Sequence, residues 1–382
     1  MTIFPRWMFT GFIGLVAVVL FGLYFYRVKQ NTSGAPTITL SSMPSQTRSL
    51  VAPQGLVAVK EFVSETKESL QEATYRNPSI RGVALRMEWN DIVSSQNKFH
   101  WDPLDQLFAN AEANNKFVVL VLVPGYGTPS WAQSGVRTET FSRKYGKGAG
   151  VASPLPLPWD ETYLSRWFTF LGAVDTRYGS RSSFRMIAAA GPTSVSAEMS
   201  LPNTENDLET WLTLGYKPSL YIGAWRQVFA QYANLFPRQF FSLALYPGLP
   251  INEAGQRDRS SRADTRQKVI DEGLNYSRQF VLQTSGLHAG NNGRDDEAAG
   301  EGAGYEIVRG YYGKVLTGFQ LSTSATRNPA KMGDVQDPVH ALQLSLEKGL
   351  EAGAQYIEVY ETDVLNPSMQ QVLAQVARQL TQ

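Results

Sequence analysis

Apolar segments of strand length recur along the chain, and amphipathic segments of helical length lie between them. The apolar segments predict strands at 56–62, 80–87, 117–123, 184–190, 240–246, 280–284, 315–322 and 355–360. The segments between them predict helices at 102–114, 161–178, 219–236, 262–277, 337–352 and 368–380. Strands that alternate with helices form a parallel sheet with right-handed crossovers, and eight of them close a barrel. The pattern therefore predicts an α/β fold, a single (β/α)8 TIM barrel.

Three long polar segments follow the C-terminal ends of predicted strands. Two of them run from about residue 124 to 159 and from about 191 to 216, and the third, after the sixth predicted strand, includes residues 291–304. Loops longer than about 15 residues are uncommon in compact domains unless they serve a function. Because the C-terminal strand ends of such a barrel meet on one face, the three loops predict a substrate cleft there.

The chain begins with an apolar stretch that is separated from the barrel by a polar one. Trp7 to Tyr26 carries no charge and has the length, about 20 residues, that spans a bilayer as a helix. Its bulky last residues do not suit signal-peptide cleavage, so residues 1–29 are expected to be a signal anchor, a transmembrane helix. Residues 30–53 are rich in Ser, Thr, Pro and Gln and predict a flexible linker. The barrel domain is then expected to span residues 54–382.

Composition excludes several classes of function. The 35 basic and 34 acidic residues nearly balance, and no basic stripe with interleaved aromatics indicates a nucleic-acid partner. The absence of cysteine excludes disulfides, thiolate metal sites and cysteine nucleophiles. The three histidines are too scattered to indicate a metal site, so neither a metal nor another cofactor is expected.

The most specific pattern runs from Gly82 to Trp131. An apolar strand ends in Arg86 and polar neighbours, a helix starts at Trp101-Asp102, and a second apolar strand leads to Thr128-Pro-Ser-Trp131. This stretch of about fifty residues resembles the (β/α)8 glycoside hydrolases of the retaining clan that includes β-galactosidases and cellulase-like endoglycanases. The resemblance implies a carbohydrate substrate. It also implies a barrel outside the cytoplasm, anchored in the membrane or secreted if the N-terminal segment is cleaved.

The resemblance also implies two catalytic carboxyl groups about 5–5.5 Å apart, an acid/base after strand four and a nucleophile at the end of strand seven. After strand four, Glu198 is the first carboxylate, so we assign it the acid/base role. The clan usually has Asn before this Glu, whereas this chain has Ala197. A loop carboxylate that caps backbone amides is the alternative interpretation of Glu198.

The expected nucleophile position departs from the clan. Strand seven offers Gln320, and an amide cannot form the glycosyl ester. Strand eight carries Glu358 and Glu361, which are costly to bury unless paired, and either is a candidate nucleophile or charge stabiliser. Alternation along the strand turns Glu358 and Tyr360 inward, while Glu361 lies nearer the open end. Alternatively, one of the two glutamates forms a structural ion pair with Arg86.

Further side chains are candidates for substrate binding. Arg86 resembles the inward arginine of the clan, whose charge keeps a nearby carboxylate ionised. His288 ends strand six, where the clan often has a histidine that contacts substrate. The remaining candidates are Trp89, Tyr126, Trp131, Gln320 and Tyr360. Each aromatic residue is individually more often core packing than a sugar platform.

Together these features predict a glycosidase that hydrolyses O-glycosidic bonds in an oligo- or polysaccharide by the two-carboxylate retaining mechanism. Gln320 motivates the alternative, a barrel at the cell envelope that binds carbohydrate without cleaving it. A structural envelope protein is a third interpretation, against which the long loops with Trp and Tyr argue.

Overall fold

Eight parallel strands close into a barrel in the computed structural model, which describes residues 50–60, 69–143, 148–291, 304–333 and 336–381. The strands run around the barrel in chain order, and the last pairs with the first. They are β1 (Gly55–Val59), β2 (Ile80–Glu88), β5 (Phe117–Val123), β8 (Phe184–Ala188), β9 (Phe240–Ala244), β10 (Phe280–Leu287), β11 (Leu316–Leu321) and β12 (Tyr356–Tyr360). The predicted (β/α)8 fold is confirmed.

The strands are apolar on both faces because helices cover one face and the barrel interior the other. Every residue of β1, β5, β9 and β12 is buried. Inside the barrel, the Tyr356 hydroxyl donates a 2.7 Å hydrogen bond to Gln283 Oε1. A side chain at Gly318 would begin only 2.0 Å from the Tyr356 ring, so this glycine makes room for the ring. Side chains therefore fill the barrel interior.

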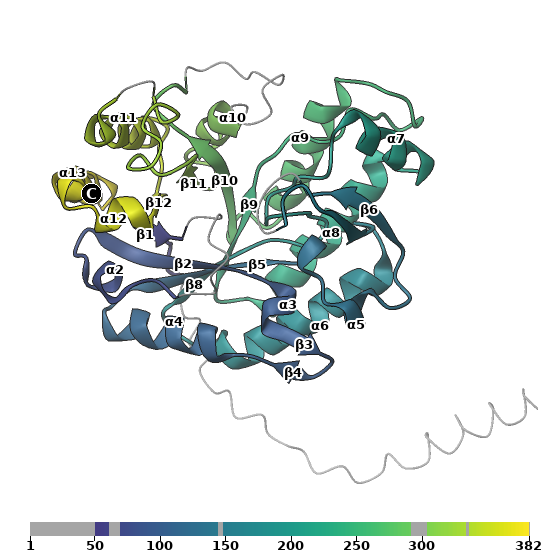
Figure 1. The fold of residues 1–382 in the computed structure, drawn as a ribbon, viewed down its shortest axis with the longest axis horizontal. Coiled ribbons are helices and arrows are strands. Elements are labelled where there is room, and N and C mark those ends of the chain that lie inside the picture. The colour runs from purple at the N-terminus through teal and green to yellow at the C-terminus, as the bar shows by residue number, and fades with distance from the viewer. Residues whose placement is uncertain (1–49, 61–68, 144–147, 292–303, 334–335, 382) are drawn as a thin grey trace, which may run out of the picture. The chain divides into compact units, whose positions relative to one another are not determined.

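Helices surround the strands, as Figure 1 shows. The long ones are α4 (Asp102–Ala113), α6 (Glu161–Tyr178), α8 (Pro218–Leu235), α9 (Ser261–Leu274), α11 (Pro338–Glu351) and α13 (Gln370–Leu380). Their starts follow helix-capping chemistry: the Asp160 side chain accepts from the Tyr163 N–H, and Asp337 accepts from Val339. All six helices predicted from the apolar periodicity are present.

Short elements occupy the connections at both ends of the barrel. They are α2 (Glu72–Arg76), α3 (Trp89–Ile92), β3 (Val93–Ser95), β4 (Lys98–Phe99), η1 (Gly125–Gly127), α5 (Ser130–Gln133), β6 (Thr138–Ser142), β7 (Ala152–Pro156), α7 (Glu205–Thr213), α10 (Gly304–Gly310), α12 (Glu361–Leu365) and η2 (Pro367–Met369). The long connections after β5 and β8 therefore carry structure of their own: the antiparallel β6–β7 hairpin and helix α7. The third long connection, 291–304, lies mostly outside the described residues.

The predicted anchor at residues 1–29 lies outside the described residues, and so does nearly all of the predicted linker at 30–53. Within the described ranges, none of the helices combines the length and the apolar character needed to cross a bilayer. The proposed domain boundaries thus remain a prediction, with the first described strand beginning at Gly55.

Candidate functional site

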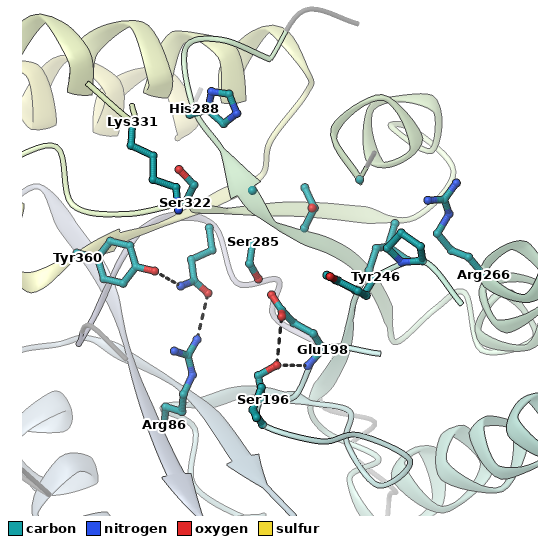
Figure 2. Close-up of a pocket in the computed structure, with 17 residues that line it drawn as sticks. Arg86, Ser196, Glu198, Tyr246, Arg266, Ser285, His288, Ser322, Lys331 and Tyr360 are labelled. Atoms are coloured by element: carbon teal, nitrogen blue, oxygen red, sulfur yellow. Dashed lines mark hydrogen bonds between the residues drawn. The ribbon is translucent and has the colours of Figure 1, made fainter. Parts of the chain in front are cut away.

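A cavity of about 310 Å³ opens where the strands end at their carboxyl termini. Strands β2, β11 and β12 contribute Arg86, Gln320 and Tyr360, while the chain beyond β8 contributes Glu198. The other residues of its lining are Val195, Ser196, Leu245, Tyr246, Pro247, Arg266, Thr284, Ser285, Gly286, His288, Gly304, Ser322 and Lys331. Figure 2 shows Glu198 on one side of this larger cavity and Arg86 and Tyr360 on the other.

Glu198 reaches the cavity by a detour of the chain. The backbone leaves β8 at Ala188, crosses the Ser-rich segment 191–197, and returns beside β9. There Glu198 forms a parallel bridge with Ala244, and the Met199 N–H donates a 3.0 Å hydrogen bond to the Ala244 carbonyl. Glu198 therefore occupies a strand-end position, although many residues separate it from the strand that precedes it.

Hydrogen bonds hold the detour closed. The Ser194 hydroxyl donates to the Ser200 carbonyl at 2.8 Å and so joins the two ends of the segment that carries Glu198. The Tyr221 hydroxyl donates to the Met199 carbonyl at 3.0 Å. Gly125 packs against the same segment with a positive φ of 57°, and a Cβ there would lie 2.2 Å from the Ser194 oxygen. The loop is thus fixed by its neighbours rather than by a strand ladder.

The Glu198 carboxylate is partly exposed and has one side-chain partner in its own loop. The Ser196 hydroxyl donates to Glu198 Oε2 at 3.1 Å, and the Glu198 N–H donates to the same hydroxyl oxygen at 3.2 Å. A smaller cavity of about 60 Å³ adjoins the larger one, and the two share Val195, Glu198 and Tyr246 in their linings. Glu198 therefore borders both cavities.

The opposite wall of the larger cavity is organised around the Gln320 amide. Arg86 Nη2 donates to Gln320 Oε1 at 3.2 Å, and Gln320 Nε2 donates to the Tyr360 hydroxyl at 2.7 Å (Figure 2). A guanidinium group only donates hydrogen bonds, so Arg86 determines which end of the amide is oxygen. These two hydrogen bonds hold the Gln320 amide at both ends on the cavity wall, and the side chain is only 3% exposed.

Glu358 lies deeper in the barrel and does not line either cavity. Its side chain is 2% exposed. Desolvation raises its pKa from 4.5 to about 7, while the charge of Arg86 and a hydrogen bond from Gln283 act in the opposite direction. The inward direction predicted for Glu358 agrees with these contacts to Arg86 and Gln283, and Glu358 pairs in register with Gln320 on β11.

Glu361 points to a different part of the molecule. It is the first residue of α12, where strand alternation has ended. Its Oε1 accepts hydrogen bonds of 2.7 Å from the Gln71 N–H and from the Thr74 hydroxyl, and Lys60 Nζ lies 3.9 Å from Oε2. Glu361 lines neither cavity, so the structure gives it a role in attaching α2 to the barrel.

The aromatic candidates separate into core and cavity residues. Trp89 is fully buried and packs edge-on against Trp131 and Trp167, with ring centroids 5.8 and 5.3 Å apart. Neither Trp89 nor Trp131 lines the larger or the smaller of these two cavities. Tyr126 lines the smaller cavity, and the Arg143 guanidinium lies 4.8 Å from its ring centre. Of these three, Tyr126 is the one that borders a cavity described here.

His288 lines the larger cavity at the end of β10. The Gly290 N–H donates to its Nδ1 at 3.1 Å, so the neutral ring carries its hydrogen on Nε2. His288 in this form is a donor through Nε2. Within the described residues, no group of three His, Asp or Glu side chains is arranged to hold a metal ion.

Sequence reasoning missed several cavity residues. They are Ser196, Tyr246, Arg266, Ser285, Ser322 and Lys331 in the larger cavity, and Asp207 in the smaller one. Ser322 directly follows the last residue of β11, and Tyr246 lies two residues beyond the end of β9; this closeness to strand ends is the signal that would have found them. Ser285 lies where the pairing of β10 with β11 shifts register, between Thr284 and Leu287. No pattern in the sequence predicts this register shift.

No protein-family model and no curated protein sequence matches the chain. Among solved structures, it is similar to a polyextremophilic β-galactosidase from the Antarctic haloarchaeon Halorubrum lacusprofundi, with a TM-score of 0.49 and 11% identity. That match covers 86% of this chain and 58% of the β-galactosidase, so the chain spans less than two thirds of that protein. Xylanase 10B from Thermotoga petrophila RKU-1, solved in complex with xylobiose, has a TM-score of 0.46 and 11% identity over 80% of this chain and 81% of its own.

The catalytic domain of the major endoglucanase from Xanthomonas campestris pv. campestris is similar at a TM-score of 0.46 and 10% identity, over 85% of this chain and 93% of its own. By their names, these three solved structures are a β-galactosidase, a xylanase and an endoglucanase. Likeness at this distance does not identify an activity or a substrate.

Proposed function

We propose that the barrel hydrolyses an O-glycosidic bond in an oligo- or polysaccharide, with Glu198 as the general acid and then the general base. The position of Glu198 between two cavities carries this proposal. A glycosidic oxygen joins two sugars, and an acid that protonates it must border the spaces that hold both. Among the described residues, Glu198 is the one carboxylate that lines both cavities.

The surroundings of Glu198 suit proton transfer. Ser196 donates to Oε2, which leaves Oε1 to carry the proton toward a ligand. The detour that holds Glu198 is anchored by Ser194 and Tyr221, so the carboxyl group keeps its place when a ligand enters. A positioned general acid typically contributes about 10²- to 10⁴-fold to a rate.

The second carboxylate that the retaining clan requires is not offered by the same wall. The larger cavity has Gln320 opposite Glu198, and Glu358 lies behind the lining, 2% exposed and with a pKa near 7. We therefore do not assign Glu358 the role of nucleophile and treat it as a buried neighbour of Arg86 and Gln283. Arg86 in turn holds Gln320 in place.

The decisive experiment compares three forms of the chain on nitrophenyl glycosides and on polysaccharides. The parent is expected to be active and Glu198→Gln to lose activity by about 10²-fold or more. Glu361→Gln makes the same chemical change at a carboxylate that lines neither cavity, and it should retain the parental rate. Equal activity in the parent and Glu198→Gln would contradict the proposal.

One observation favours a second candidate function, a barrel that binds carbohydrate without cleaving it. Gln320 stands where the clan has its nucleophile, and its amide is held in a fixed orientation by Arg86 and Tyr360. Fixed polar groups in a cavity favour binding as well as catalysis. Calorimetric titration with oligosaccharides would separate the two functions: binding by the parent and by Glu198→Gln, with turnover by neither, would favour the binding barrel.

We also propose that residues 1–29 anchor the barrel to a membrane on the extracytoplasmic side. The uncharged apolar stretch Trp7 to Tyr26 supports this proposal. The full chain should sediment with membranes and resist carbonate extraction, whereas a form beginning at Val51 should stay in the supernatant. Extraction of the full chain by carbonate would contradict the anchor.

A further inference from the structure

We infer that the sugar held in the larger cavity carries an acetamido group on carbon 2, and that this group attacks the anomeric carbon in place of a protein nucleophile. The inference rests on the proposed hydrolysis by Glu198. It names the substrate class of that site, a 2-acetamido sugar such as occurs in chitin-like and peptidoglycan-like glycans.

The first argument is the character of the wall opposite Glu198. Gln320 cannot form a glycosyl ester, because it has no carboxylate. Of the described residues that line the larger cavity, Glu198 is the one carboxylate, and the neutral His288 ring carries its hydrogen on Nε2. The His288 Nε2 in this form is a donor and cannot deprotonate a water molecule. An attacking group from the substrate removes the need for a second protein base.

The second argument is the match between this wall and an amide group. Gln320 Oε1 accepts from Arg86 and has a second lone pair, which suits an acetamido N–H. The Tyr360 hydroxyl accepts from Gln320 Nε2 and so keeps its own hydrogen, which suits the acetamido carbonyl oxygen. Both side chains line the larger cavity. One neighbouring pair of groups thus complements both polar ends of the acetamido substituent.

The chemical step balances without a further reagent. The acetamido oxygen forms a bond to carbon 1 while the bond from carbon 1 to the leaving oxygen breaks and takes its electron pair. The Glu198 proton passes to that oxygen, which leaves a cyclic oxazolinium ion and a Glu198 carboxylate. Water then adds to carbon 1 as the ring opens to the acetamide, and its proton returns to Glu198. Two displacements at carbon 1 give net retention of configuration.

In this scheme Gln320 orients the acetamido nitrogen and stabilises the positive charge that develops there. Because Oε1 is fixed toward Arg86, the amide cannot rotate to present Nε2 instead. The wall therefore acts on the charge that forms on the substrate, while Glu198 acts on the leaving oxygen.

The test uses the full chain and pairs of 4-nitrophenyl glycosides, gluco and galacto, that differ only in acetamido or hydroxyl at carbon 2. The acetamido member of a pair should react at least 100-fold faster in kcat/KM. Successive fluorination of its acetyl group should lower kcat stepwise, because fluorine weakens the attacking oxygen. The corresponding thiazoline should inhibit competitively.

Equal rates within each pair, or rates that do not respond to fluorination, would overturn the inference and leave hydrolysis by Glu198 in place. Binding of both members with no turnover of either would overturn the proposed hydrolysis itself. The two failures are therefore distinguishable.

Two variants sharpen the test. Gln320→Glu supplies a carboxylate where the amide stands, so the acetamido preference should fall and turnover of the 2-hydroxy glycoside should rise. Gln320→Leu removes the polar contacts while keeping the volume; kcat for the acetamido substrate should fall more than KM changes. A Gln320→Leu form that is folded by circular dichroism and keeps its full kcat would contradict the role of this amide.

Discussion

The two walls of the larger cavity are built in different ways. Glu198 stands on a loop that returns to the barrel after a detour, and its neighbours hold it through Ser194, Tyr221 and Ala244. Gln320 stands within β11, and its amide is fixed by side chains from β2 and β12. The comparison shows that the two groups differ in burial as well as in support: the Glu198 carboxylate on its loop is partly exposed, whereas the Gln320 amide with its fixed partners is buried.

The largest expected effect on the rate comes from replacing the carboxyl group of Glu198. Glu198→Gln should slow cleavage of glycosides with alkoxide leaving groups by about 10²- to 10⁴-fold. Dinitrophenyl leaving groups need no proton, so with them the loss should be less than about tenfold. The measurement is kcat/KM for a series of leaving groups in both forms. A loss that is uniform across the series would show that Glu198 is not the acid.

The buried carboxyl group of Glu358, near Arg86, predicts that the stability of the fold depends on pH. Burial raises the pKa of Glu358 from 4.5 to about 7, so between these values the folded chain keeps a proton that the unfolded chain has lost. The contribution of Glu358 to folding is fully present below about pH 4.5 and is lost as pH rises to about 7. At about 1.4 kcal/mol per pKa unit, the loss is on the order of 3 kcal/mol.

The measurement is urea unfolding of the parent and Glu358→Gln from pH 5 to pH 8. Relative to the parent, the variant should gain stability as pH rises, because glutamine has no charge to desolvate. A difference between the two forms that does not vary with pH would contradict the burial of an ionisable Glu358.

A variant of Glu361 tests whether this residue belongs to the cavity wall or only stabilises the fold. It follows Tyr360 in the chain, yet its carboxylate binds Gln71 and Thr74 on the far side of the strand end. Glu361→Ala leaves two donors without their acceptor and should cost about 2 kcal/mol in the free energy of unfolding. Rates measured on the folded fraction should match the parent. A large loss of kcat at unchanged stability would place Glu361 in the site.

The smallest expected effect comes from the hydrogen bond between Ser194 and Ser200, which closes the loop that carries Glu198. Ser194→Ala removes the hydrogen bond to the Ser200 carbonyl and should destabilise the fold by about 1 kcal/mol. Because Glu198 would be less well positioned, kcat should fall by a factor of a few while leaving-group dependence is kept. Thermal unfolding and kcat together check this, and Ser165→Ala, at an exposed position of α6, is the control.

The strands and long helices were predictable because their burial follows directly from the chain's apolar pattern. β5 is apolar at every position and is buried at every position. The inward direction of Glu358 followed from alternation along a regular strand. Glu361 did not follow from it, because β12 ends at Tyr360 and a helix begins at the next residue.

Other parts of the site depend on contacts between distant segments and were not predictable from the local sequence. The bridge between Glu198 and Ala244 depends on the loop closing through Ser194, and no periodic pattern marks it. Trp89 lies after a strand end, as a ligand platform would, yet it packs against Trp167 on α6. An apolar ring at a strand end can turn either way, and the neighbouring helix decides.

The hydrogen bond from Tyr356 to Gln283 across the barrel interior has a consequence for how a ligand enters and leaves the cavity. With the interior filled below the cavity, a ligand has no passage through the barrel axis. Under the proposed hydrolysis, both fragments of a cleaved chain depart on the side by which the intact chain arrived. The fragment seated against Gln320 is then expected to leave last, and its accumulation is expected to slow turnover.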